Sequence, residues 1–479
     1  MMKSFPLSVC CLLSFLADPA TALQAQTTAP HRLLVLTDIE ADPDDTQSLI
    51  RLLLYANEIE IEGIVATTST WMREAIHPES VERIITTYGE VRPNLILHDP
   101  AYPTAESLLT KVYDGLPVYG MTGVGEGKDS EGSARIIDLL EADDDRPLWV
   151  SVWGGINTLA QALYTIRETK TKEEADRLIG KLRVYTISDQ DDSGPWIREN
   201  FPGVFYVFSY GDYGRSTWIA INGRFPGIDN TTISNAWLND HIQQDHGPLG
   251  AAYPDVAWGM EGDTPAWLWL VANGLHAPEH PDWGGWGGRY EKYTPDFDPD
   301  GAGAPGIPFT AETRPVWTDA SDTYTPFLPS AYGRAVERAD TSFTGNKVTL
   351  WRWRDDFQRD FAARMDWTVQ SVEAANHAPV PVLDNPREIT VSSGQGFRLD
   401  AARSTDPDGD HLSFLWYHYP EPGSLQEEIR FAPENAASVW VTAPEVEREE
   451  TAHFILEVTD HGTPALTAYE RVIVRILRE

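Results

Sequence analysis

The stretch that decides the fold is Thr37-Asp38-Ile39-Glu40-Ala41-Asp42-Pro43-Asp44-Asp45, which places five carboxylates within eight residues. The apolar residues 33–36 before it predict a buried strand, and residues 49–54 after it predict a helix with an apolar face. Strand-to-helix turns of this kind bind ligands in open α/β sheets. Carboxylates this close together repel one another, so they must be protonated or hold a cation. The alternative is a solvated acidic loop that caps the helix.

The charge composition argues against two classes of binding partner. The 479 residues carry a formal net charge of −36, and the acids are spread along the chain instead of forming a tail. Nucleic acids and anionic membranes bind to basic surfaces, so neither is expected as a partner. The length allows one large domain and a smaller one.

Residues 1–25 have the pattern of a signal peptide. Lys3 supplies the positive charge, residues 7–16 the apolar core, and Ala20-Thr21-Ala22 a small-residue cleavage site. The apolar core is too short to span a membrane. Both cysteines, Cys10 and Cys11, fall inside this segment, so the mature chain is expected to have none. We therefore expect a secreted or periplasmic protein.

From residue 30 to residue 375, strand patterns alternate with helix patterns. This alternation predicts a domain built on a doubly wound, mostly parallel sheet. Three turns that follow strands, at 38–45, 154–158 and 188–194, are polar or rich in glycine. Because the carboxyl ends of parallel strands share one edge, these turns should face a common crevice.

Two further sets of acids belong to this prediction. Asp189, Asp191 and Asp192 lie either in the crevice or in a solvated turn. Asp263 precedes an apolar helix pattern, where a carboxylate either caps the helix or turns outward to a ligand.

The amino-acid composition and pattern change in the later part of the chain. Residues 273–345 are rich in Gly, Pro, Asp and aromatic residues, which predicts long ordered loops. In this region Trp283 and Trp286 either stack on sugar rings or pack against their own domain. Residues 378–479 contain short alternating apolar runs, which predict an immunoglobulin-like β-sandwich.

The acidic turn resembles the signature of nucleoside hydrolases, in which an Asp and a second acid precede an Asp-Asp pair that opens a helix. Here these residues are Asp38, Glu40, Asp44 and Asp45. Gly154-Gly155-Ile156-Asn157-Thr158-Leu159-Ala160 and Gly262-Asp263-Thr264-Pro265 resemble two further turns of that superfamily. The resemblance implies a calcium ion, a cation that prefers oxygen ligands. Its implied ligands are Glu40, Asp45, Asp263 and the main-chain carbonyl of Asn157.

A closer resemblance covers nearly the whole mature chain. Residues 37–40, 188–198, 260–265 and 283–290 are similar to a family of secreted bacterial proteins. These proteins join a nucleoside-hydrolase-like domain to an immunoglobulin-like C-terminal domain, and some are described as cellulose-binding. The resemblance implies a sugar or nucleoside-like ligand, with cellulose or another plant polysaccharide as a further partner.

The resemblance to nucleoside hydrolases also implies a reaction. A carboxylate takes a proton from a metal-activated water, and the resulting hydroxide attacks an anomeric carbon. Glu40 stands in the position of this base, and Asp44 in the position that holds sugar hydroxyls. The sequence departs from the pattern at three places. Position 40 is Glu instead of Asp, Thr68 replaces an Asn that contacts ribose, and Gly262 replaces a His of several purine-cleaving relatives.

Three hypotheses follow. The first is a calcium-dependent hydrolase of N-glycosyl or other small glycosyl compounds, with Glu40 and Asp44 as catalytic residues. Its expected substrate contacts are Asp44, Thr68, Asp191, Asp192, Trp283 and Trp286. The second is a non-catalytic cellulose- or polysaccharide-binding protein that kept the fold. The third is an O-glycosidase, which needs a second, protonated carboxyl group from residues 189–192.

Overall fold

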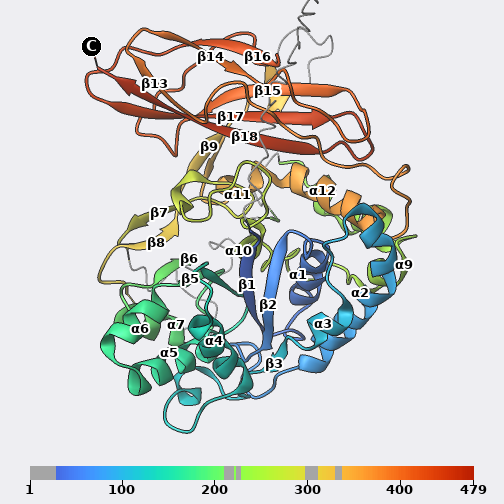
Figure 1. The fold of residues 1–479 in the computed structure, drawn as a ribbon, viewed down its shortest axis with the longest axis vertical. Coiled ribbons are helices and arrows are strands. Elements are labelled where there is room, and N and C mark those ends of the chain that lie inside the picture. The colour runs from blue at the N-terminus through green and yellow to red at the C-terminus, as the bar shows by residue number, and fades with distance from the viewer. Residues whose placement is uncertain are drawn as a thin grey trace, which may run out of the picture. The chain divides into compact units, whose positions relative to one another are not determined.

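The computed structural model describes residues 29–209, 219, 221–222, 228–296, 311–328 and 337–478 (Figure 1). The expected signal peptide at 1–25 lies outside the described residues, as do residues 297–310 of the predicted loop region. Residues from His31 onward belong to one structural unit. Within the described ranges, no helix is long and apolar enough to cross a bilayer.

An eight-stranded sheet is the centre of the N-terminal part. Its spatial order is β3 (Val112–Asp114), β2 (Ile59–Ala66), β1 (His31–Thr37), β4 (Leu148–Val152), β5 (Leu182–Thr186), β6 (Phe205–Phe208), β8 (Val316–Asp319) and β7 (Tyr290–Tyr293). All neighbours pair in parallel except β7 and β8. The chain passes from β1 to β2 and β3, then returns to β4 on the other side of β1. Ligand crevices of open α/β sheets form where the strand order reverses in this way.

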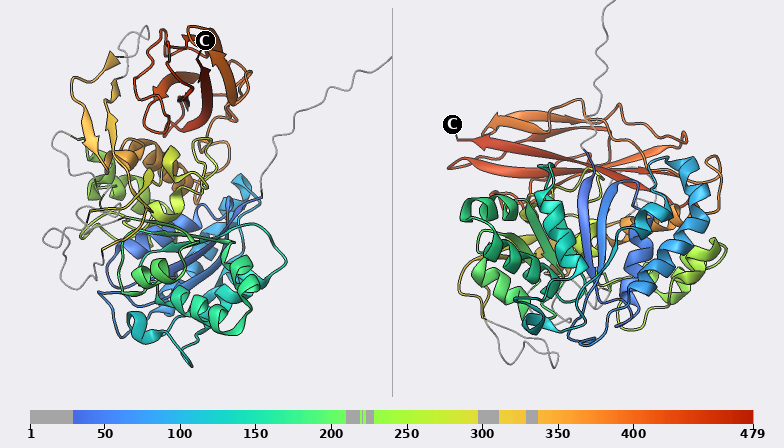
Figure 2. Two further views of the ribbon diagram at one scale, coloured as in Figure 1. Left: turned by 90° about the vertical axis from the view of Figure 1, so that its left-hand side faces the viewer. Right: turned by 60° about the horizontal axis from the view of Figure 1, so that its bottom comes forward.

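Helices cover both faces of this sheet (Figures 1 and 2). One face packs against α1 (Asp44–Leu53), α2 (Pro78–His98), α10 (Pro265–Leu268) and α12 (Arg354–Asp366). The other packs against α4 (Glu131–Glu141), α5 (Asn157–Thr169), α6 (Lys172–Ile179) and α7 (Ser193–Asn200). Within β1, Leu33 and Val35 join the first core and Leu34 and Leu36 the second. Successive strand residues point to opposite faces, so an all-apolar strand is buried on both sides.

Shorter elements complete the N-terminal part. They are α3 (Ala105–Leu109), η1 (Gly120–Gly123), η3 (Thr231–Ile233), α8 (Asn235–Leu238), η4 (Asn239–Gln243), α9 (Gly247–Ala252), η5 (Pro281–Trp283), α11 (Val348–Trp351), and the strand pairs β9 (Asp322–Tyr324) with β12 (Phe343–Gly345) and β10 (Phe327–Leu328) with β11 (Glu337–Arg338). β7 and β8 fall in the region predicted to be loops. Both are four residues long, too short to show a periodic pattern, and β8 is placed by its pairing with β6 and β7.

The C-terminal part is made of strands only. A four-stranded sheet contains β13 (Glu388–Ser392), β18 (Thr467–Leu477), β17 (Glu450–Asp460) and β15 (Leu412–Tyr419), and a second sheet pairs β14 (Gly396–Asp400) with β16 (Ser438–Thr442). Alternate residues of these strands, such as Phe397, Leu399, Phe454 and Leu456, form one core between the sheets. The predicted fold class, an α/β domain followed by an all-β domain, is confirmed.

The main chain at Gly274 touches the last strand of the sandwich. Gly274 has a φ of +87°, and a Cβ added there would overlap the carbonyl group of Tyr469. The neighbouring carbonyl of Asn273 accepts a hydrogen bond of 2.9 Å from the backbone N–H of Tyr469. Arg471 donates to the carbonyl oxygens of Leu275 and Gly284 from the same strand. The two parts are therefore joined by main-chain contacts that leave no room for a side chain.

Gly274→Ala should lower stability far more than its conformation alone explains. The positive φ costs about 1 kcal/mol for alanine, and overlap with the Tyr469 carbonyl should add about 1–3 kcal/mol. Gly409→Ala is the matched control, because Gly409 has a φ of +83° and open space around its Cβ position. Urea unfolding of both variants measures the difference. Equal losses would show that the contact at Gly274 contributes nothing.

Candidate functional site

A cavity of about 470 Å³ opens at the carboxyl-terminal edge of the parallel sheet, at the switch point between β1 and β4. It is lined by side chains from the turns after β1, β2, β4 and β5 and from the segment before α10. These residues are Asp38, Ala41, Asp42, Asp44, Asp45, Trp71, Trp153, Gln190, Trp258 and Asp263. The volume lies in the range of small-molecule sites. The acidic turn after β1 thus lies in a crevice, as the strand-edge argument predicts.

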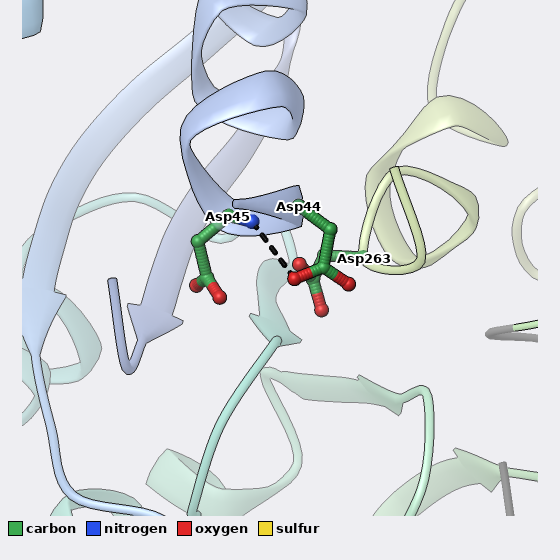
Figure 3. A group of neighbouring side chains, drawn as sticks. All are labelled: Asp44, Asp45 and Asp263. Atoms are coloured by element: carbon green, nitrogen blue, oxygen red, sulfur yellow. Dashed lines mark hydrogen bonds between the residues drawn. The ribbon is translucent and has the colours of Figure 1, made fainter. Parts of the chain in front are cut away.

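Three of the carboxylates form a tight group. Asp44 and Asp45 begin α1, and Asp263 lies beside Asp44 on the turn that leads into α10 (Figure 3). One carboxylate oxygen from each residue lies within 4.8 Å of the others, and all three side chains are at most 3% exposed. The chain brings residues more than 200 positions apart to one point, as the resemblance implies for Asp45 and Asp263.

Local hydrogen bonds fix the first turn of α1. The Thr37 hydroxyl, at the end of β1, donates to Asp45. The backbone N–H of Asp45 donates to Asp44 at 3.1 Å, and that of Asp44 donates to Asp42 at 3.0 Å. The positive end of the helix dipole also favours negative charge at this position. Acids of the turn therefore accept hydrogen bonds from the first backbone N–H groups of the helix and line the cavity at the same time.

One face of α1 holds the segment that carries Asp263. Arg51 and Glu261, both with fully buried side chains, form an ion pair of 2.6 Å. The side chain of Gln47 accepts a bond of 3.0 Å from the backbone N–H of Glu261, and Thr264 donates to Ser48 at 3.0 Å. The helix that supplies two of the carboxylates thus also positions the third.

The grouped carboxylates carry like charges that repel one another. Burial, followed by the charges of Asp44, Asp45 and Asp38, holds the pKa of Asp263 well above its ordinary value. Burial and the Asp38 charge do the same for the pKa of Asp45. The Asp263 Oδ2 atom is buried and has no hydrogen-bond partner among the described residues. A buried oxygen without a partner costs about 1–3 kcal/mol, so this atom is available to a ligand that the protein chain does not supply.

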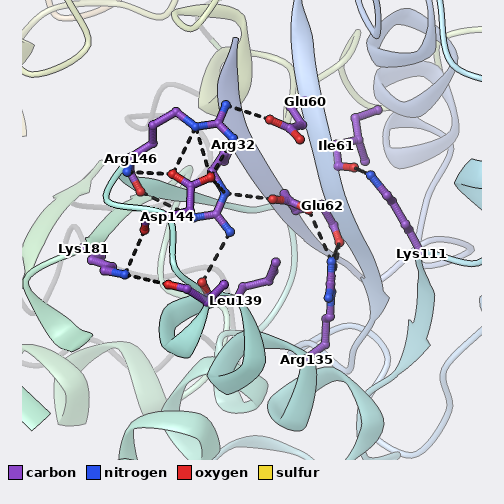
Figure 4. Close-up of polar contacts among 11 residues, drawn as sticks. Arg32, Glu60, Ile61, Glu62, Lys111, Arg135, Leu139, Asp144, Arg146 and Lys181 are labelled. Atoms are coloured by element: carbon purple, nitrogen blue, oxygen red, sulfur yellow. Dashed lines mark hydrogen bonds and ion pairs between the residues drawn. The ribbon is translucent and has the colours of Figure 1, made fainter. Parts of the chain in front are cut away.

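At the opposite edge of the sheet, acidic side chains are paired with arginines and need no ligand. There Arg32 pairs with Glu62 at 2.8 Å, and Arg146 pairs with Asp144 at 2.7 Å and with Glu60 at 2.8 Å (Figure 4). Within the described ranges, no arginine, lysine or histidine forms such a pair with Asp45 or Asp263. The three buried carboxylates can therefore hold a metal ion, which would neutralise them in place of an arginine.

Asp38 is a fourth buried carboxylate in the cavity. It packs against Gly154, where an added Cβ would lie 2.7 Å from Asp38 Oδ1. Burial raises its pKa to about 7, against the effect of a hydrogen bond from Ser69. The glycine after β4 therefore makes room for this side chain. The sequence identifies Asp38 only as part of the nucleoside-hydrolase signature. The rule that places the turn after β1 at the edge of the sheet applies equally to Asp38.

Glu40 does not join the metal group. Its backbone has a φ of +83°, and its carboxylate accepts hydrogen bonds from the Ser80 hydroxyl and from Arg83 at 2.9 Å, both on α2. The side chain is 43% exposed and does not line the cavity. This placement corrects the expectation of Glu40 as a calcium ligand and base, because the left-handed backbone turns the side chain toward α2.

Asn157 and Thr68 lie behind the cavity. The Asn157 amide donates to the carbonyl of Val118 at 2.7 Å and accepts from the Thr67 hydroxyl at 2.9 Å. The Thr68 hydroxyl donates to the same Val118 carbonyl at 3.3 Å. Asn157 is also the first residue of α5, so helix geometry directs its main-chain carbonyl along the helix. Neither residue lines the cavity, contrary to the expected ligand and substrate contacts.

The acids after β5 are held by protein groups. Asp191 accepts from the backbone N–H of Ser193 at 2.8 Å and of Asn157 at 3.1 Å, at the starts of two helices. Asp192 accepts from the backbone N–H of Met121 at 2.8 Å. Asp189 forms a buried, two-pronged pair with Arg198. These placements correct the expectation of Asp191 and Asp192 as substrate contacts. Gln190, between them, does line the cavity.

Trp286 packs inside the protein, and Trp283 is half-buried beside it. Trp286 is 1% exposed and lies edge-on to Phe357 and Tyr469. Trp283 stacks on His280 at a centroid distance of 4.1 Å and meets His453 edge-on. The structure therefore favours packing over sugar stacking for both, because strands of the sandwich cover this loop.

Trp71 and Trp258 are cavity residues that the sequence motifs did not indicate. They line the cavity and are 51% and 73% exposed, which is unusual for such large apolar side chains. Trp71 follows β2 and Trp258 precedes Asp263 in the chain. Attention to aromatic residues within a few positions of each predicted site turn would have found both. Exposed aromatic faces beside buried acids are typical of a site that binds an amphipathic ligand such as a sugar.

Comparison with known proteins identifies the family. Residues 32–290 match a family described as "Cellulose-binding Sde182, nucleoside hydrolase-like domain", and residues 396–476 match "Cellulose-binding protein Sde0182, C-terminal domain". The chain belongs to this family. The resemblance seen in the sequence motifs is thereby confirmed, and the Sde182 family associates the chain with carbohydrate.

A solved structure supports this assignment over nearly the whole chain. It is described as "a nucleoside hydrolase-related hypothetical protein from Saccharophagus degradans that is associated with carbohydrate metabolism". The two chains are 35% identical with a TM-score of 0.78, and the match covers 93% of this chain and 100% of the other. The effector protein XOO4466 matches at 12% identity and a TM-score of 0.26, over 60% of this chain and 87% of its own. No curated protein matches.

Proposed function

We propose that the protein binds calcium in this cavity and hydrolyses a small glycosyl compound there. The Asp263 Oδ2 atom carries this proposal, because it is buried without a described partner beside Asp44 and Asp45. The three carboxylate oxygens lie within 4.8 Å of one another, close enough to bind one ion together. Calcium is the ion that the resemblance implies, and it prefers oxygen ligands of this kind.

Three residues of the cavity have roles in this proposal. When bound, calcium supplies a Lewis acid that orients hydroxyl groups and polarises water. Asp44, one of the three grouped carboxylates, also holds sugar hydroxyls, the role implied by the resemblance. Asp38 lines the same cavity and takes a proton from the attacking water, the role first expected of Glu40. Gln190 lines the same cavity and contacts the substrate there.

The two exposed tryptophans favour a saccharide as the substrate. Trp71 and Trp258 come from different turns and extend the site beyond the acidic floor of the cavity. Aromatic faces of this kind pack against the apolar C–H faces of sugar rings, while the sugar hydroxyls reach polar groups. Together with the cellulose-binding description of the family, this points to a compound derived from a plant polysaccharide.

The proposal is tested by turnover of nucleosides, aryl β-glucosides and cello-oligosaccharides by the purified mature protein. Activity should disappear in EDTA and return with calcium. Asp38→Asn should lower kcat by about 10²- to 10⁴-fold, the usual effect of losing a general base. Asp42→Asn is the control from the same turn, since the amide oxygen still accepts from the Asp44 backbone. Absence of turnover of every substrate with calcium present would contradict hydrolysis.

Replacing Trp71 or Trp258 by Ala should weaken saccharide binding. An aromatic contact contributes about 0.5–1.5 kcal/mol, so each variant should raise the Kd roughly two- to tenfold. Trp440→Ala is the matched control, because Trp440 on β16 is 63% exposed and does not line this cavity. Calorimetric titration with a cello-oligosaccharide measures the three Kd values. Equal Kd values in all three variants would remove the tryptophans from the site.

A non-catalytic polysaccharide-binding role is the second candidate. The hydrogen bonds of Glu40 to α2 favour it, because the residue in the signature's base position does not line the cavity. This candidate predicts that saccharides bind in a calcium-dependent manner and are recovered intact. Measurement of binding and of product release on the same sample separates the two candidates.

Export from the cytoplasm is also part of the proposal, since the expected signal peptide matches a role on extracellular polysaccharide. N-terminal sequencing of the protein from the producing cells should find the first residue after position 25 or close to it. An intact Met1 would contradict export by cleavage.

A further inference from the structure

The last residue of β1 carries a hydroxyl group where the rest of the strand core is apolar. Residues 33–36 are fully buried, and Thr37 follows them at 1% exposed. Leu33 and Val35 lie on the same face of the strand as Thr37 and pack in the core that includes α1. The Thr37 side chain therefore lies on the side of the helix that supplies Asp45. The mechanism proposed above gives this hydroxyl no role.

Two hydrogen bonds determine the direction of the hydroxyl proton. The backbone N–H of Ile39 donates to Thr37 Oγ1 at 3.1 Å, and Thr37 Oγ1 is in turn bonded to Asp45 Oδ1. An ionised carboxylate can only accept hydrogen bonds. When Asp45 is ionised, as a cation ligand must be, it therefore receives the single hydroxyl proton of Thr37. The hydroxyl then holds one of the two carboxylate oxygens in place.

The strand end that carries this hydroxyl is held from both sides. The Thr37 carbonyl accepts from the backbone N–H of Thr67, after β2, at 2.8 Å. The Leu36 carbonyl accepts from the backbone N–H of Trp153, after β4, also at 2.8 Å. The backbone of Asp45 belongs to the first turn of α1, but its carboxylate is thus tied to the centre of the parallel sheet.

The same hydroxyl also fixes the backbone around Asp38. Thr37 and Ile39 flank Asp38 in the chain, and the bond from the Ile39 N–H to Thr37 Oγ1 closes a small ring across it. Asp38 is the residue proposed above as the base. One hydroxyl group therefore connects the turn that carries the proposed base to a carboxylate of the proposed metal site.

The Asp45 carboxylate needs such support. Burial and the charge of Asp38 raise the pKa of Asp45 well above its ordinary value, and the hydrogen bond from Thr37 opposes them. A carboxylate among like charges is driven to protonate or to turn away. Partners that hydrogen-bond to a metal ligand fix its orientation, and their loss typically lowers metal affinity 10- to 100-fold.

The competing role for Thr37 is simple packing. Thr186 is an example of a buried threonine at a strand end that makes no contact with a carboxylate through its hydroxyl. It is the last residue of β5, is 2% exposed and donates to the carbonyl of Ser188 at 2.8 Å. The two threonines have the same place in their strands and the same burial, and they differ in the group that receives the hydroxyl proton.

We propose that Thr37 is a positioning residue of the metal site. Its hydroxyl fixes the Asp45 carboxylate and thereby sets the affinity of the three grouped carboxylates for calcium. This inference rests on the calcium binding proposed above, and it does not depend on hydrolysis of any substrate.

The test separates the hydroxyl of Thr37 from its shape. Thr37→Val keeps nearly the same shape and removes the hydroxyl, whereas Thr37→Ser keeps the hydroxyl and removes the methyl group. Thr186→Val is the matched control at the end of β5. Calorimetric titration of the full chain with calcium chloride, after removal of EDTA, measures the Kd of each protein. Circular dichroism in EDTA shows whether each variant is folded.

Thr37→Val should raise the Kd for calcium about 10- to 100-fold. Thr37→Ser and Thr186→Val should keep a Kd close to that of the natural protein. Thr37→Ala also lacks the hydroxyl and serves if Thr37→Val does not fold.

Three results would overturn the proposal. A folded Thr37→Val protein with the natural Kd would do so and would leave the calcium site itself standing. A loss in Thr37→Ser or in Thr186→Val as large as in Thr37→Val would mean that packing, and not the hydroxyl bond to Asp45, sets the affinity. Absence of calcium binding by the natural protein would overturn this proposal together with the calcium site of the proposed function.

Discussion

Calcium should raise the melting temperature of the natural protein and leave that of Asp263→Asn unchanged. The three buried carboxylates repel one another, and a cation removes this repulsion. A ligand present at a hundred times its Kd stabilises the folded state by about 2.7 kcal/mol. The variant keeps the shape of the side chain but loses the charge, so it should lose most of this gain. In EDTA the variant should be at least as stable as the natural protein, because one buried carboxyl group has been removed.

Asp42→Asn is the matched control for this experiment. Asp42 belongs to the same turn and lines the same cavity, but it is not one of the three grouped carboxylates. Its calcium-dependent rise in melting temperature should be close to that of the natural protein. If the rise in melting temperature persists in Asp263→Asn, or is lost equally in both variants, calcium binding does not depend specifically on the Asp263 carboxylate.

Arg51→Met should destabilise the folded protein strongly. It leaves the Glu261 charge buried without its partner, and the loss of one member of a buried ion pair costs about 3–5 kcal/mol. Because Glu261 is two residues before Asp263, the substitution should also weaken calcium binding. Replacing Glu261 as well, in Arg51→Met/Glu261→Gln, should restore part of the stability, since no unpaired charge remains.

An exposed ion pair of the same two residue types serves as the control for the buried one. Arg83 and Glu40 also form an arginine–glutamate pair, but the two side chains are 59% and 43% exposed. Arg83→Met should therefore cost less than about 1 kcal/mol and leave calcium binding unchanged. Urea unfolding with and without calcium measures both variants. Similar losses for Arg51→Met and Arg83→Met would mean that the Arg51 pair has no special role in placing Asp263.

The position of Asp44 and Asp45 at the edge of the sheet could be predicted from the sequence, because it depends on rules that hold for every parallel sheet, and the resemblance to nucleoside hydrolases implied Asp263 as their neighbour. Turns at the carboxyl ends of such strands share one edge, and the signature residues lie in these turns. The same rule, applied to the neighbouring positions, places Asp38 and Gln190 in the cavity. The α/β class and the sandwich followed from periodicity, which each strand and helix carries locally.

The errors have a different physical origin. The position of Glu40 depends on a left-handed backbone and on Ser80 and Arg83, which lie 40 and 43 residues away in the chain. Trp286 is buried by Tyr469, 183 residues later. Asp191 serves as a cap for two helices because their first turns meet there. Such long-range contacts leave no periodic pattern or local spacing in the sequence.

The central claim is that Asp44, Asp45 and Asp263 form a calcium site in a saccharide-binding cavity. The most direct test is an anomalous difference map from a crystal soaked in a terbium salt, since lanthanide ions occupy calcium sites and scatter anomalously. We expect one strong peak about 2.3–2.6 Å from a carboxylate oxygen of each of the three residues. Peaks on surface acids only, with none among these three side chains, would contradict the claim.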